Sequence, residues 1–192
     1  TITQQGQRFT WSASSFDGFA RPVSVAKASD IAGAAARNEL TQYHDNLSMW
    51  ILGQPAQSSV NGIVVSETSY DTKAMPITVR TFGRVSQTLA YNADGTIGSV
   101  QDGNGHTTTL SAWKRGIPQS IRFPATPEAP AGATRSAAAG DHGWILSGVD
   151  ENGYETRYQY DARGRTARTG HTTKDRGGWD ATQHESHEDG RS

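Results

Sequence analysis

Polar and less polar side chains alternate one by one between residues 154 and 160. Every second position there carries a tyrosine or a threonine: Tyr154, Thr156, Tyr158 and Tyr160. A period of two is typical of a β-strand with one half-buried face. Asp161 to Gly164 then predict a type I turn closed by a glycine bulge, because Asp accepts nearby backbone N–H groups and Gly tolerates a positive φ. Residues 165–169 are predicted to return as the partner strand.

The same signature, an aromatic anchor followed by Asp or Asn with Gly or Ala four places after the anchor, recurs at Phe16, Tyr70 and Tyr91. Two degenerate copies keep the glycine but have Ala112 and Ala139 as anchors, and a weaker copy begins at Tyr43. The anchors fall at positions 16, 43, 70, 91, 112, 139 and 160, and are separated by either 27 or 21 residues. Two recurring spacings predict a repeat protein. The residues that define the repeat are Phe16, Asp17, Tyr70, Asp71, Tyr91, Asn92, Gly95, Gly116, Gly143, Tyr160, Asp161, Gly164 and Arg165.

A second turn motif, Asp-x-Asn-Gly-x-x-Thr, begins at Asp102 and at Asp150. Each repeat unit is therefore predicted to run strand, turn, strand, turn. The longer units are expected to hold their extra residues in loops near 27–40 and 124–140, which costs little loop-closure entropy. The first insertion is open to one or two helical turns behind Ser29 or Asp30 as the cap. The second contains three prolines and is predicted to be an exposed loop.

The motif Tyr-Asp-x-x-Gly-Arg with a preceding Asp-x-x-Gly-x-x-Thr resembles the YD repeat of the RHS (rearrangement hot spot) family. The best matches are "YDARGRT", "YNADGTI" and "FDGFARPV", and the stretch "YHDNLSMWILGQ" is similar to large bacterial RHS and wall-associated-type proteins. The resemblance covers residues 9 to 170. It implies an all-β array of stacked antiparallel β-hairpins that is part of a spiral shell, as in insecticidal toxin-complex C subunits and teneurins.

The resemblance also implies a role. In bacterial members of the family the shell encloses a toxic C-terminal domain until delivery, which implies a secreted or cell-surface location. Expected partners are the remaining RHS repeats of a longer chain or neighbouring copies, and an enclosed toxin polypeptide. After Thr169 the sequence departs from the family pattern, since neither a processing segment nor a toxin domain is recognisable. The aromatic anchors are expected to supply most of the apolar area of a continuous core between stacked hairpins.

The composition agrees with a chain of short strands and turns. It has 21 glycines in 192 residues and only 34% hydrophobic residues, which is unlike a helical bundle. The absence of cysteine excludes disulfides and thiolate metal sites. A net charge of −1 provides no general attraction to nucleic acid or anionic lipid. No apolar run is long enough for a membrane span, and the first residues lack a signal-peptide pattern.

Candidate chemistry is weak, and we predict no catalytic residue, no cofactor and no metal. The neighbours His44 and Asp45 would face opposite sides of a strand, as would Asp141 and His142, and no nucleophile elbow is present. The two Asp-x-Asn-Gly segments lack the downstream Glu of a calcium loop and are predicted to be turns. The polar run His184-Glu185-Ser186-His187 lacks the spacing of a zinc motif.

From His171 onward the repeat and nearly all apolar residues disappear, so residues 171–192 are predicted to be a disordered polar tail. Residues 1–170 are predicted to be a non-catalytic RHS/YD array that forms part of a wall around a toxin or other polypeptide cargo. Two alternatives stay open. One is a cell-surface adhesion module that binds glycan or protein, and the other is a non-functional truncated fragment.

Overall fold

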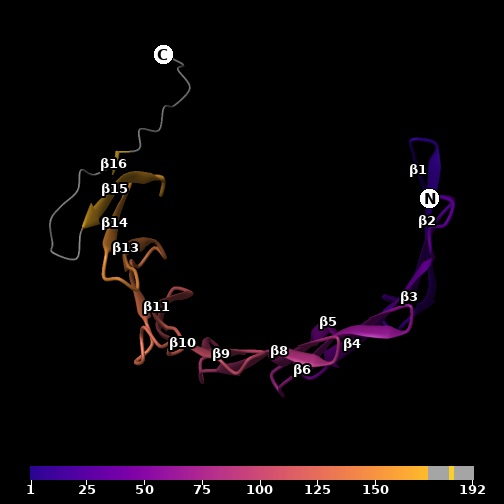
Figure 1. Ribbon diagram of the computed structural model, residues 1–192, viewed down its shortest axis with the longest axis horizontal. Coiled ribbons are helices and arrows are strands. Elements are labelled where there is room, and N and C mark those ends of the chain that lie inside the picture. Colours follow the sequence, from indigo (N-terminus) through magenta and orange to yellow (C-terminus); the bar gives the residue numbers. More distant parts are fainter. Residues whose placement is uncertain (173–181, 184–192) are drawn as a thin grey trace, which may run out of the picture. The chain divides into compact units, whose positions relative to one another are not determined.

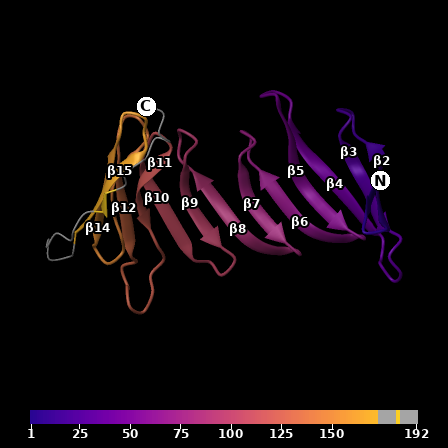
Figure 2. The same ribbon diagram turned by 90° about the horizontal axis from the view of Figure 1, so that it is seen from above.

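The computed structural model describes residues 1–172 and 182–183, and in these ranges all regular secondary structure is β-strand (Figures 1 and 2). Consecutive strands pair in antiparallel fashion, so strand order follows chain order. The predicted all-β array of antiparallel hairpins is confirmed. The chain divides into two compact units, Thr1–Leu89 with Asp102–Gly105, and Ala90–Gln101 with His106–Ser192.

The first unit is a single layer of strands joined by short turns. The longest ladders join β2 to β3 and β4 to β5. The strands are β1 (Ile2–Gln4), β2 (Gln7–Phe16), β3 (Pro22–Ser29), β4 (Arg37–Asn46), β5 (Ile51–Val60), β6 (Ile63–Tyr70), β7 (Pro76–Thr81) and β8 (Arg84–Tyr91), of which the last two residues belong to the second unit.

The second unit repeats this plan. The strands are β9 (Ile97–Asp102), β10 (Thr107–Lys114), β11 (Ile117–Arg122), β12 (Thr134–Ala139), β13 (Ile145–Val149), β14 (Glu155–Tyr160), β15 (Thr166–Thr172) and β16 (Thr182–Gln183). Along β14, Thr156, Tyr158 and Tyr160 are half-buried, whereas Arg157 and Gln159 are exposed. The predicted alternation is therefore present from Thr156 to Tyr160, whereas Tyr154 lies before the strand and is exposed, and Glu155 is half-buried.

One kind of turn follows the strands that end at an anchor. In the turn after Tyr160, the N–H of Gly164 donates to the carbonyl of Asp161 at 3.0 Å, and Gly164 has a φ of 80°. The β14–β15 register shifts by one residue beside it. These features confirm the predicted type I turn with a glycine bulge. The same closing hydrogen bond occurs in the turns 17–20, 71–74, 92–95 and 140–143.

A second kind of turn has only two residues, both with positive φ, as a type I′ hairpin requires. Its four instances among the described residues are Gln5-Gly6, Asn61-Gly62, Phe82-Gly83 and Arg115-Gly116. Gly116 therefore lies in a tight two-residue turn, and not in the wider turn that its spacing from Ala112 predicted.

Two predicted anchors are not at strand ends. Tyr43 lies inside β4 and Ala112 lies inside β10. β4 contains a bulge, with a register shift at Gln42/Tyr43, whereas the register of β10 with β11 is unbroken at Ala112, which has a φ of 54°. A bulge adds one residue to a strand without adding a turn, so the count from Tyr43 no longer gives the turn position.

The insertions are shorter than predicted, and the first is not helical. Ser29 ends β3 and Arg37 begins β4, which leaves residues 30–36 as an irregular loop. The residues on both sides pair as strands, so tertiary pairing overrides the helix propensity of the alanines. The second loop occupies residues 123–133, and β12 uses the rest of the predicted insertion.

The expected continuous core is absent from the described residues. Only three of them are buried, Ala74, Ala139 and Thr169, and Phe16 is 57% exposed. A single layer of strands has no second layer to cover its faces, so anchors such as Tyr70, Tyr91 and Tyr160 are half-buried at most. β15 continues to Thr172 and so includes the first two residues of the predicted tail, and residues 173–181 and 184–192 of that tail lie outside the described residues.

Candidate functional site

Aromatic side chains connect each hairpin to the backbone of an earlier one. The hydroxyl of Tyr160 donates to the carbonyl of Ile145 at 2.7 Å, and the hydroxyl of Tyr70 donates to the carbonyl of Pro55 at 2.8 Å. Two further contacts of this kind run from Tyr43 to Pro22 (3.3 Å) and from the indole N–H of Trp113 to Ile97 (3.0 Å). We call these four contacts the aromatic ladder.

Three of the four acceptors share one place in the repeat. Pro22, Ile97 and Ile145 are the first residues of β3, β9 and β13, and each lies six residues after a predicted anchor. Proline is tolerated at the first position of a strand because no ladder N–H is needed there. The backbone carbonyl of that residue can still accept a hydrogen bond, so the aromatic ladder is compatible with either Pro or Ile at this position.

The turn aspartates hold the turns through their carboxylates. Asp161 accepts the backbone N–H groups of Arg163 and Arg165 at 2.9 Å each, and its other oxygen accepts Nε of Arg165 at 2.7 Å. The backbone N–H of Arg165 is the main reason that the pKa of Asp161 lies below its ordinary value. Each turn is thus fixed by groups within five residues of one another.

The turn after Phe16 has the same geometry although it lacks the glycine. Asp17 accepts the backbone N–H groups of Phe19 (2.9 Å) and Arg21 (3.0 Å), and Nε of Arg21 at 2.7 Å. The guanidinium of Arg21 is the main cause of the lowered pKa of Asp17. Ala20 takes the glycine place with a φ of 58°, a conformation that is strained for a residue with a Cβ.

Arg21 also binds the next hairpin. Its two Nη atoms hold the carboxylate of Asp45 at 2.8 and 2.7 Å, and its guanidinium lies 4.4 Å from the ring centre of Tyr43. This bidentate pair and the N–H of Gly53 lower the pKa of Asp45 to about 2. The side chains of Arg21 and Asp45 are each only 21% exposed. Planar, bidentate and partly shielded pairs are the ion pairs that contribute most to stability.

Other predicted repeat residues lie at equivalent places. Asp71 accepts the N–H groups of Lys73 and Met75 at 2.8 Å each, as Asp161 does in its own turn. Tyr91 ends β8, and the N–H of Gly95 donates to the carbonyl of Asn92 at 3.0 Å. Gly143, with a φ of 80°, closes the turn that follows Ala139. The structure therefore places these residues at strand ends and turns and not in one concave site.

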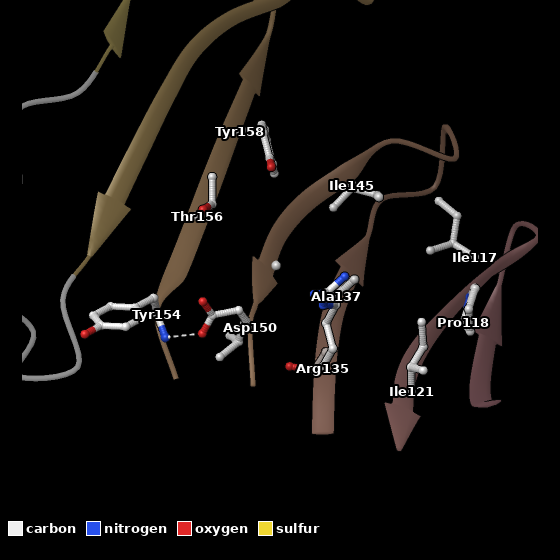
Figure 3. Close-up of a pocket in the computed structure, with 13 residues that line it drawn as sticks. Ile117, Pro118, Ile121, Arg135, Ala137, Ile145, Asp150, Tyr154, Thr156 and Tyr158 are labelled. Carbon is white, nitrogen blue, oxygen red and sulfur yellow. Dashed lines mark hydrogen bonds between the residues drawn. The ribbon is translucent and has the colours of Figure 1, made fainter. Parts of the chain in front are cut away.

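A groove of about 390 Å³ crosses one face of β11 to β14 in the second unit (Figure 3). Its lining is mostly apolar and includes Ile117, Ile121, Ala137 and Val149. Figure 3 shows Thr156 and Tyr158 on β14 at one side of it, with Tyr154 just before the start of that strand. A shallow apolar groove of this kind suits an extended or irregular polypeptide surface better than the enclosed site of a small-molecule enzyme.

Asp150 fixes the end of the groove. Its carboxylate accepts the N–H groups of Asn152 and Tyr154 at 2.9 Å each, and the second of these bonds is the dashed line in Figure 3. Arg135, which also lines the groove, holds Glu151 at 2.9 Å. The charged groups at this end are therefore engaged in contacts of the turn itself.

The histidines considered for chemistry make unrelated contacts. His44 stacks on Tyr70 with ring centres 4.8 Å apart, whereas Asp45 binds Arg21. Asp141 pairs with Lys114 at 2.8 Å, whereas His142 lies beside Trp144. No cluster of three potential metal ligands occurs within the described residues. The described ranges hold no helix long and apolar enough to cross a membrane.

Sequence reasoning missed the aromatic ladder and the clamp between Arg21 and Asp45. The ladder had a signal in the constant distance of six residues between an anchor and the acceptor residue. The clamp between Arg21 and Asp45 had a weaker signal. Arg21 and Arg165 both end an Asp-x-x-x-Arg turn, but among the described residues only Arg21 also binds a carboxylate of a following hairpin.

These features define the class of protein as a repeat-built β-hairpin array without a described catalytic constellation. Residues 141–177 match the family model described as RHS Repeat, which confirms the resemblance that the YD motifs indicated. The family match covers residues 141–177, and the all-β array of hairpins continues on the N-terminal side of it. A comparison with curated proteins finds no match.

Two solved structures share this fold. One is described as "Crystal Structure of TcdB2-TccC3", with a TM-score of 0.64, 12% identity, and coverage of 94% of this chain and 10% of the other. The second is the Tc holotoxin pore of Photorhabdus luminescens with the mutation TccC3-D651A. It has a TM-score of 0.59 and 12% identity, with 88% and 9% coverage. The present chain therefore spans about a tenth of the length of these proteins.

Proposed function

We propose that this chain is a segment of the wall of an RHS-type shell that encloses a polypeptide cargo. The observation that carries the proposal is the aromatic ladder in a layer with only three buried described residues. Such a layer depends on contacts between successive hairpins and has no core of its own. This is the construction of a wall that gains stability from its neighbours.

Large apolar side chains at the turns support the same function. Trp50 is 71% exposed and Phe82 is 66% exposed, and both have positive φ values, 54° and 49°. Exposure and backbone strain are each unfavourable for an aromatic residue. Both costs are offset if further repeats cover these turns in a complete wall. The remaining RHS repeats of a longer chain, or neighbouring copies, are therefore the proposed partners, and the toxin or other polypeptide is the proposed cargo.

The test uses the polypeptide that carries this segment together with its cargo. Tyr70→Ala and Tyr160→Ala together remove two rungs of the aromatic ladder, and the cargo should then become sensitive to an added protease while the parent stays full length. Tyr154→Ala is the matched control, because the side chain of Tyr154 takes no part in the ladder. Equal protection of the cargo in all three proteins would argue against containment by this wall.

A surface adhesion module is the second candidate. The exposed aromatic side chains of Trp11 and Trp50 favour it, since such residues are common in binding surfaces. An adhesion module predicts saturable binding of a glycan or protein that is lost in Trp50→Ala, without any effect on cargo protection. A truncated fragment without function predicts no cooperative unfolding of the isolated chain. The wall function implies a secreted or cell-surface protein.

A further inference from the structure

The chain contains three Asn-Gly pairs, at Asn61, Asn104 and Asn152, and the structure holds them very differently. An asparagine followed by glycine is chemically labile when its side chain is free, because glycine has no Cβ to hinder attack by its own backbone nitrogen. We propose that Asn152 is a spontaneous deamidation site and that its reaction remodels the end of the groove in Figure 3. The proposal goes beyond the containment function and does not depend on it.

Asn61 is held in place by residues around the start of β4, far from it in the sequence. Its Oδ1 accepts the N–H of Asn38 at 2.8 Å, and its Nδ2 donates to the carbonyl of Ala36 at 3.4 Å. Its own backbone N–H donates to the carbonyl of Asn38 at 2.8 Å. The side-chain carbonyl carbon is thus kept from the nitrogen of Gly62, so this pair serves as an internal reference for a protected asparagine.

Asn152 has a free side chain. It is exposed, and among the described residues its only hydrogen bond is the one from its backbone N–H to Asp150 at 2.9 Å. The nucleophile, the nitrogen of Gly153, is restrained by one bond to the carbonyl of Asp150 at 3.1 Å. The side chain of Asn61 must break two hydrogen bonds before it can react, whereas the side chain of Asn152 has none to break among the described residues.

Asn104 has the same turn but a closer neighbour. Its backbone N–H donates to Asp102 at 2.9 Å, as that of Asn152 does to Asp150. A Cβ placed on the adjacent Gly103 would lie 2.6 Å from the carbonyl oxygen of Val85, so this turn packs tightly against β8. The corresponding residue in the turn at Asn152 is Glu151, whose side chain pairs with Arg135 at 2.9 Å. We therefore assign the fastest reaction to Asn152.

The reaction balances without any added reagent except water. The nitrogen of Gly153 forms a bond to Cγ of Asn152, its proton passes to solvent, and Nδ2 leaves as ammonia. Water then opens the five-membered succinimide at either carbonyl. The products are aspartate or isoaspartate, and in isoaspartate the main chain runs through the former side chain and is one methylene longer.

That extra methylene lies between the two backbone groups that Asp150 holds. Asp150 accepts the N–H groups of Asn152 and Tyr154 at 2.9 Å each, and both Asp150 and Tyr154 line the groove. A longer main chain cannot keep both bonds at that length. The new carboxylate also lies beside Asp150 and Glu151, so like charges further loosen the turn. Isoaspartate at this position is expected to release Tyr154 from its place at the groove end.

The experiment incubates the full 192-residue chain at mildly alkaline pH and locates deamidated residues by peptide mass spectrometry. Isoaspartate is assigned by enzymatic methyl transfer, and the amide of Tyr154 is followed by hydrogen exchange. We expect Asn152 to react at least about tenfold faster than Asn61, since the extra hydrogen bonds at Asn61 must open first. The amide protection of Tyr154 should fall in step with isoaspartate formation.

Two controls make the result decisive. In concentrated urea the three pairs should react at similar rates, because the folded contacts that separate them are lost. The variant Asn152→Gln keeps a side-chain amide but would need a less favourable six-membered ring, so it should preserve the protection of Tyr154 during the same incubation. Equal rates at Asn61 and Asn152 in native buffer would overturn the proposal, and so would loss of Tyr154 protection in Asn152→Gln.

Discussion

The hydroxyl of Tyr160 lies 2.7 Å from the carbonyl oxygen of Ile145, and it is the shortest rung of the aromatic ladder. Tyr160 ends β14 and Ile145 begins β13, so the bond runs from the end of one strand to the start of the preceding one. The ring of Tyr160 lies 5.0 Å from that of Trp144, the residue next to the acceptor. A hydrogen bond and a ring contact thus join the same two hairpin ends.

Removal of this hydroxyl should weaken the second unit. We expect Tyr160→Phe to lower the free energy of unfolding by about 0.5–1.5 kcal/mol, the usual net contribution of one hydrogen bond. Urea unfolding followed by circular dichroism measures the change. Tyr154→Phe is the matched control, because Tyr154 is 49% exposed and its hydroxyl takes no part in the aromatic ladder. An equal loss in both variants would show that the rung to Ile145 contributes nothing of its own.

Exchange of Gly and Ala at the last position of the wide turns should change stability in opposite directions in two repeats. Gly164→Ala should destabilise by roughly 1–2 kcal/mol, because φ is 80° and a Cβ would lie 2.9 Å from the ring of Trp144. Ala20→Gly should stabilise by up to about 1 kcal/mol, because φ at Ala20 is already 58°. Thermal or urea unfolding of the two variants tests both signs. A stabilising Gly164→Ala, or a destabilising Ala20→Gly, contradicts the assignment of a common turn.

Interactions between residues close together in the chain explain which hairpins could be predicted from the sequence. Tyr160, Asp161 and Gly164 predicted their hairpin because alternation, an Asp cap and a turn glycine all act within a few residues. Asn61-Gly62 was a strong but overlooked hairpin signal, and Phe82-Gly83 was not predictable, since Phe is disfavoured at positive φ.

Longer-range features exceeded what the sequence alone could predict. A bulge in β4 moved the turn away from Tyr43, and a bulge leaves no reliable mark in a single sequence. The clamp of Arg21 on Asp45 depends on the register between separate hairpins, which alternation within one strand does not determine. The groove likewise arises only where four strands lie side by side.

The clamp between Arg21 and Asp45 should make the first unit sensitive to acid. The pKa of Asp45 falls from 3.8 to about 2 on folding, so its ion pair contributes fully above about pH 4 and is lost as the pH drops towards 2. Asp45→Asn should therefore be less stable than the parent at neutral pH, and the difference should shrink over that acid range. Urea midpoints measured at several pH values give the difference directly.

The control for the clamp is Glu128→Gln, since Glu128 lies in the exposed 123–133 loop and forms no ion pair among the described residues. Its stability should follow the parent at every pH. Arg21→Lys should resemble Asp45→Asn at neutral pH, because an ammonium cannot make the two parallel bonds of the guanidinium. A constant difference between Asp45→Asn and the parent down to pH 2 would mean that the charge of Asp45 is not what holds the two hairpins together.

The turn between β7 and β8 tests whether further repeats cover an exposed aromatic side chain that has a strained backbone conformation. Phe82 is 66% exposed with a φ of 49°, and Asn61 holds the same first position of a two-residue turn with the same φ. Asparagine tolerates this conformation, so Phe82→Asn should stabilise the isolated chain by about 0.5–1 kcal/mol and reduce its self-association. Thermal unfolding and light scattering measure the two effects.

If Phe82 contacts further repeats in the complete wall, the same substitution should weaken the parent protein while it stabilises the segment. Stabilisation of both proteins would mean that no neighbour covers this turn, and destabilisation of the isolated segment would mean that Phe82 has a structural role within it.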